Sequence, residues 1–129
     1  MGAALVARLA RRRLRGVACD ADYQLNVENA LDCAARDLVV FVDAARGLGR
    51  PFSFTRVRPA ASLPAMSHAL TPGAVLAVAA DLYGKRPDAR LLAVRGRSFA
   101  VGEGLTARAE ADLERALAFL VAFLKGDRR

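Results

Sequence analysis

The sequence predicts an α/β fold, a three-layer sandwich in which a mostly parallel, twisted sheet lies between helices. Short apolar runs typical of strands alternate along the chain with amphipathic stretches typical of helices. The 129 residues suffice for one domain, and no internal repeat or linker divides them. We therefore expect a single α/β domain over residues 1–129.

The first fifteen residues, MGAALVARLARRRLR, are rich in arginine and contain no acid. This composition fits either an organellar transit peptide or the first helix of the domain. Leu5 and Leu9 would share one face of a helix, but arginines soon interrupt that apolar stripe. A short β-prone run follows at Val17–Asp20.

Three elements are predicted in the middle of the chain. Asn26–Ala35 is expected to be a helix whose apolar face consists of Val27, Ala30, Leu31 and Ala34. Leu38–Val42 is a continuous β-branched and aromatic run ending at Asp43, which favours a strand covered on both faces. Phe52–Arg58 alternates between apolar and polar side chains in a mixed pattern that favours an edge strand.

The second half of the chain carries clearer signals for helix ends. A helix is predicted over Pro72–Tyr83, because Thr71 is a good N-cap, proline suits the first helical position and Gly84 follows the last turn. Arg90–Val94 is predicted to be another apolar strand. A last helix is expected after Thr106, with an apolar face formed by Leu113, Leu117, Leu120, Val121 and Leu124.

The formal net charge of +7 raises the question of a nucleic-acid partner. Residues 1–15 contribute +5 and residues 125–129 contribute +2, whereas basic and acidic side chains balance between them. Because the surplus lies at the two chain ends, we expect no nucleic-acid partner. We also expect no membrane partner, since the longest apolar stretch, Ala116–Leu124, is too short to span a bilayer.

Cys19 and Cys33 are the two cysteines, and they form no CxxC pair. Two thiols are too few for a structural zinc site. Both fall in predicted elements, where buried free thiols are expected. This usage is compatible with the reducing cytoplasm.

Asp43 and His68 are the candidate metal-ligating residues. In an open parallel sheet, ligands bind beyond the carboxyl ends of the strands, where Asp43 is expected to lie. His68 precedes a helix that runs back to the next strand, so it can face the same crevice. A carboxylate and an imidazole suit Ni²⁺ or Zn²⁺, but two residues define a weak site, and Asp43 could equally be a cap or turn residue. No GxSxG or Walker pattern points to a serine hydrolase or a phosphate loop.

Several segments in this order resemble the hydrogenase maturation proteases: DLVVFVDA (37–44), MSHALTP (66–72), LLAVRG (91–96) and FAVGEGLT (99–106). The segment DYQLNVENALD (22–32) resembles the helix-opening region of one branch of that family. The resemblance implies a phosphorylase/hydrolase-like fold and a cytoplasmic endopeptidase. Such an enzyme removes the C-terminal extension from the large-subunit precursor of a nickel–iron hydrogenase.

The resemblance also implies roles for the two candidate residues. Asp43 and His68 match the second and third metal ligands of the family, which coordinate nickel already installed in the precursor. No residue is assigned as the general base. The family's first ligand and first strand have no counterpart here, so we expect the sequence to begin after them. Three functions therefore stay open: the endopeptidase; a non-catalytic binding module or relic that contacts a hydrogenase precursor or an assembly factor; or a small cytosolic α/β protein with an unrelated ligand.

Overall fold

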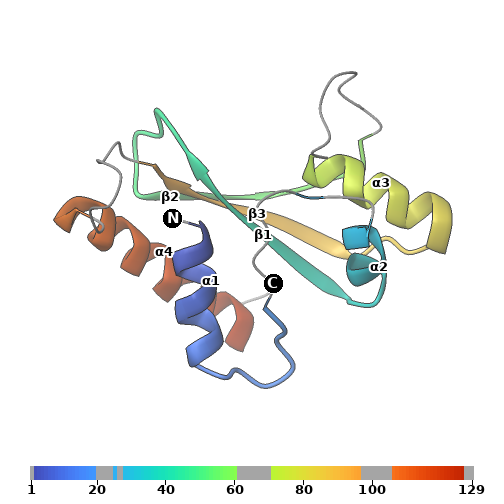
Figure 1. The fold of residues 1–129 in the computed structure, drawn as a ribbon, viewed down its shortest axis with the longest axis horizontal. Coiled ribbons are helices and arrows are strands. Elements are labelled where there is room, and N and C mark those ends of the chain that lie inside the picture. Colours follow the sequence, from blue (N-terminus) through green and yellow to red (C-terminus); the bar gives the residue numbers. More distant parts are fainter. Residues whose placement is uncertain (1, 20–24, 26–27, 61–70, 97–105, 127–129) are drawn as a thin grey trace. The chain divides into compact units, whose positions relative to one another are not determined.

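The computed structural model of the protein describes residues 2–19, 25, 28–60, 71–96 and 106–126. Four helices and three strands occur in these ranges (Figure 1): α1 (Gly2–Arg11), α2 (Glu28–Ala34), β1 (Leu38–Ala45), β2 (Phe52–Arg56), α3 (Pro72–Tyr83), β3 (Asp88–Arg95) and α4 (Ala107–Lys125). The chain forms two compact units. Unit 1 comprises Met1–Ala21, Val42–Ser53 and Leu92–Arg129, and unit 2 comprises Asp22–Phe41 and Phe54–Leu91.

The three strands form one mixed sheet in the order β1-β3-β2, which confirms the predicted α/β class and the edge position of β2. β1 and β3 are parallel, because the Asp88 N–H donates to the Asp37 carbonyl and the Gly96 N–H donates to the Ala45 carbonyl, each at 2.9 Å. β2 runs antiparallel to β3, since the Val57 N–H donates to Ala89 at 2.9 Å and the Arg95 N–H donates to Pro51 at 2.8 Å.

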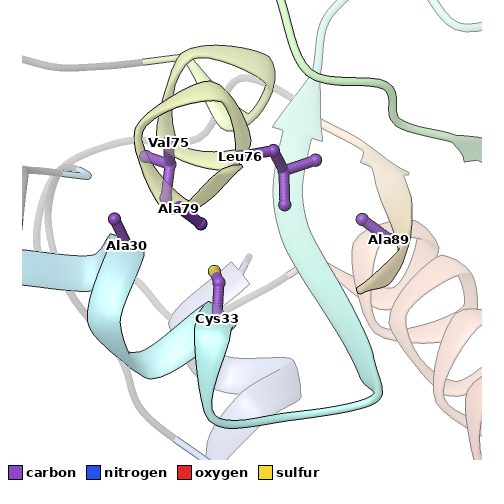
Figure 2. Packing of buried hydrophobic residues seen from close by; sticks show 6 residues of the cluster. All are labelled: Ala30, Cys33, Val75, Leu76, Ala79 and Ala89. Atoms are coloured by element: carbon purple, nitrogen blue, oxygen red, sulfur yellow. The ribbon is translucent and has the colours of Figure 1, made fainter. Parts of the chain in front are cut away.

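Unit 2 is built around the contact between α2 and α3 (Figure 2). Its buried cluster consists of Ala30 and Cys33 from α2, Val75, Leu76 and Ala79 from α3, and Ala89 from β3. Val39 and Phe41 of β1 pack against this cluster while remaining partly exposed. The side chains that α2 contributes to this cluster, Ala30 and Cys33, are both small.

The bounds of α3 agree with the prediction, because its end signals are local. The Thr71 side chain accepts a hydrogen bond from the Ala74 N–H at 3.1 Å. Gly84 closes the helix in the left-handed conformation, with φ 66°, and its N–H bonds to the last turn. A Cβ at Gly73 would lie 3.0 Å from the Arg58 carbonyl oxygen, so a larger residue there would need a small shift of this backbone.

In unit 1, α1 packs against α4 (Figure 1). Leu5 and Leu9 of α1 are buried, and α4 buries the predicted face at Leu113, Leu117, Leu120 and Val121. Arg8 pairs with Glu110 and Glu114 of α4. The first helix is therefore a packed part of the fold. In the described part of the chain, no helix combines the length and apolarity needed to cross a membrane.

Several sequence predictions need correction. Residues 17–19 of the predicted β-prone run at Val17–Asp20 are not in a strand, because the chain turns at Gly16, where φ is 76°, and the Val17 N–H bonds back to Leu14. Cys19 is exposed rather than buried, whereas Cys33 is buried as predicted.

The apolar face predicted for the second helix is also partly wrong. Ala30 is buried and Ala34 is partly buried, but Leu31 is 55% exposed and Cys33 is buried instead. The reason is that α3 packs along the face containing Ala30 and Cys33, which are three residues apart. Val27 lies outside the described residues. β1 is longer than predicted and only half-buried, because it is an edge strand among the described residues.

Candidate functional site

Asp43 lies near the carboxyl end of β1, with its side chain exposed. Its Oδ1 accepts a hydrogen bond from the Ala44 N–H at 2.8 Å. Among the described residues, no other donor contacts this carboxylate. Because β1 and β3 are parallel, their carboxyl ends lie at the same edge of the sheet, next to the Ala45–Gly96 hydrogen bond.

His68, the other candidate metal ligand, lies outside the described residues. Its proximity to Asp43 therefore stays a prediction. Within the described ranges, no three His, Cys, Asp or Glu side chains are grouped so that they could hold a metal ion.

A cavity of about 280 Å³ in unit 1 lies at the end of β3, where that strand meets the start of β2. Its lining consists of Pro51, Arg95, Arg108, Ala111, Asp112 and Arg115. We call it the arginine cavity. Arg95 is the last residue of β3, so the cavity belongs to the same strand-end edge as Asp43.

A bidentate ion pair with Asp112 fixes the side chain of Arg95 in this cavity. The Arg95 Nε donates to Asp112 Oδ2 and its Nη2 donates to Oδ1, both at 3.0 Å. The Asp112 carboxylate also raises the pKa of Arg95 above its ordinary value, chiefly through this hydrogen bonding. The guanidinium is therefore permanently charged and fixed in orientation.

The two arginines that α4 contributes to the cavity, Arg108 and Arg115, are exposed. Among the described residues, no carboxylate lies within ion-pair distance of either one. Among the described residues, the lining of the cavity contains three arginines and one aspartate, an excess of two positive charges. Formal charges summed over consecutive segments of the sequence do not indicate this cluster, because Pro51, Arg95 and Arg115 come together only in the folded chain.

A second cavity, of about 290 Å³, lies in unit 2 at the amino ends of β1 and β3. It is lined by Ala34, Ala35, Arg36, Asp37, Lys85, Arg86 and Pro87. Its basic residues follow the carboxyl ends of α2 and α3, where cations compensate the negative end of the helix dipole. Their position thus has a structural explanation.

Comparison with known proteins gives one informative likeness. No family model matches the sequence, and no curated protein matches it. Among solved structures, the chain is similar to the hydrogenase maturating endopeptidase HybD from E. coli, with a TM-score of 0.68 and 26% sequence identity. The likeness covers 97% of this chain and 82% of the other.

Proposed function

The chain is a structural relative of the hydrogenase maturation proteases, and we propose that it is an endopeptidase that removes the C-terminal extension of a hydrogenase large-subunit precursor. The likeness to HybD over 97% of the chain is the observation that supports this proposal most strongly. The reaction hydrolyses one peptide bond. Water adds to the carbonyl carbon, the C–N bond breaks, and the leaving amine takes a proton. We further propose that this processing takes place in the cytoplasm.

We propose that nickel carried by the precursor is recognised by Asp43 and His68. A carboxylate oxygen and an imidazole nitrogen are suitable ligands for Ni²⁺. The exposed carboxylate of Asp43 near the carboxyl end of β1 supports such a contact. A divalent ion bound there supplies Lewis-acid polarisation of a substrate carbonyl or of water.

The experiment uses the nickel-loaded and nickel-free forms of the precursor from the same organism. Each form is incubated with the protein, and C-terminal cleavage is followed by mass spectrometry. Cleavage of the nickel-loaded form alone is the expected result. Binding of the precursor without cleavage would favour the non-catalytic binding module instead.

Variants at the candidate ligands make this experiment specific. Asp43→Asn and His68→Gln are each expected to slow cleavage at least about tenfold, as the loss of a metal contact does. Asp81→Asn is the matched control, because Asp81 is an exposed aspartate of α3. If Asp43→Asn cleaves the precursor at the wild-type rate, Asp43 is not a nickel ligand. Melting curves of the variants show whether the fold is retained.

A further inference from the structure

The arginine cavity contains a cation that helix stability does not explain. Arg108 is the second residue of α4, which begins at Ala107 after its Thr106 cap. The first turn of a helix is the positive end of its dipole, so an arginine there is unfavourable. This placement is the reverse of that in unit 2, where Arg36, Lys85 and Arg86 follow helix carboxyl ends.

The geometry of α4 leaves room for a ligand between two arginines. Arg108 and Arg115 are seven residues apart, two helical turns or about 10 Å along the axis, so they lie on the same face. Ala111, between them on that face, has a small exposed side chain that also lines the cavity. Both guanidinium groups can therefore reach an anion seated over Ala111.

The third arginine of this cavity already binds a carboxylate of the chain itself. Arg95 already binds the Asp112 carboxylate through two parallel hydrogen bonds of 3.0 Å. The planar guanidinium suits such bidentate recognition of carboxylate and phosphate oxygens. The cavity is a shallow, open depression of about 280 Å³, so an extended peptide that carries carboxylates can lie along it.

We propose that the arginine cavity binds carboxylate groups of the peptide substrate, through Arg108 and Arg115. This inference rests on the proposed function, because an endopeptidase must hold an extended peptide at the edge where it acts. Asp43 and the cavity belong to the same compact unit and the same strand-end edge. An acidic segment of the hydrogenase precursor is thus the expected occupant.

Direct peptide binding tests the proposal without requiring cleavage. The probe is a fluorescein-labelled peptide of alternating glycine and glutamate, and its glutamine analogue is the uncharged comparison. Fluorescence anisotropy at low salt should detect binding of the glutamate peptide only. Arg108→Gln and Arg115→Gln should each weaken binding about threefold, and the double variant about tenfold.

The matched control carries the same charge change in the other cavity. Arg36→Gln/Arg86→Gln removes two arginines from the unit 2 cavity and is expected to leave the affinity unchanged. Arg108→Gln should also raise the melting temperature slightly, because it removes a cation from the helix amino end. A loss of binding together with a higher melting temperature cannot be caused by unfolding. Equal weakening by the control, or retained affinity in the double variant of α4, would overturn the proposal.

Two competing ligands and the processing assay complete the test. If inorganic phosphate or a single-stranded DNA of 20 nucleotides binds more tightly and is equally sensitive to the α4 variants, the cavity is a phosphate site and the proposal is wrong. Slower precursor cleavage by the double variant is the expected result. If the wild-type protein does not cleave the precursor but still binds the acidic peptide through these arginines, the proposed endopeptidase function is wrong and the proposed carboxylate site is confirmed.

Discussion

Arg95 and Asp112 form a bidentate ion pair, with two hydrogen bonds, that joins the end of β3 to the second turn of α4. Asp112 is 4% exposed and is the buried charged residue of the described core. The two hydrogen bonds from the Arg95 guanidinium compensate this carboxylate for the hydration that it loses on burial. The pair therefore fixes both the strand end and one wall of the arginine cavity.

Removing the charge of Asp112 should destabilise the protein. We expect Asp112→Asn to lower the melting temperature by roughly 5 °C or more, because it leaves the Arg95 guanidinium without its carboxylate. Arg95→Gln/Asp112→Asn should recover part of that loss, since both charges are then absent. Wild type, Arg95→Gln, Asp112→Asn and the double variant form a double-mutant cycle. Thermal melting of these four proteins measures the coupling between the two side chains. Strictly additive shifts would mean that the pair contributes no coupling. Asp81→Asn serves as the exposed control.

The contact of Arg8 with Glu110 and Glu114 should contribute less, because all three side chains are solvent-accessible. We expect Arg8→Gln to lower the melting temperature by no more than about 3 °C, and by less in high salt. A shift that is independent of salt would indicate lost packing of the arginine stem rather than lost charge.

The same contact predicts a pH dependence. Hydrogen bonding to Arg8 lowers the pKa of Glu110 below its ordinary value. The pair therefore stabilises the fold fully above the unfolded pKa of about 4.3, and this contribution is lost as the pH falls through the lowered folded pKa. The difference in melting temperature between wild type and Arg8→Gln should be constant from pH 7 to pH 5 and should shrink below about pH 4. A constant difference at all pH values would contradict this assignment.

The two threonine caps should each contribute measurably to stability. The hydroxyls of Thr71 and Thr106 accept hydrogen bonds from the N–H groups of Ala74 and Ala109, both at 3.1 Å. Thr71→Ala and Thr106→Ala should each reduce the free energy of unfolding by about 1 kcal/mol, whereas the matching serine variants should retain it. Urea unfolding is the measurement. Equal losses for alanine and serine would show that the methyl group, not the hydroxyl, matters.

The two cysteines should differ in reactivity. Cys33 is 4% exposed, and burial raises its pKa, with a further contribution from the charge of Asp32. Cys19 is exposed, although partial desolvation also raises its pKa. Iodoacetamide should therefore label Cys19 in the native protein and Cys33 only after denaturation, as followed by mass spectrometry. Simultaneous labelling of both would mean that α2 opens readily from α3.

Helix ends were the features that sequence analysis predicted best. The helix Pro72–Tyr83 has its predicted bounds because Thr71 and Gly84 act on backbone groups within a few residues. The face of α2 was predicted less well. Over seven residues, periodicity cannot distinguish a core containing Leu31 from one containing Cys33, and the packing of α3 makes that choice.

The candidate site likewise has features that the sequence predicts and features that depend on the tertiary structure. Sequence patterns alone determined the α/β class, the resemblance to the hydrogenase maturation proteases, and the choice of Asp43 and His68 as candidate ligands. Only the tertiary structure decided that Arg95 meets Asp112 and that Arg108 and Arg115 share a cavity with them. Caps and periodicity act between residues a few positions apart, so they can be read along the chain. The packing of β3 against α4 decides which charged side chains meet and become buried. Such contacts join residues far apart in the sequence, so the spacing of neighbouring residues does not predict them.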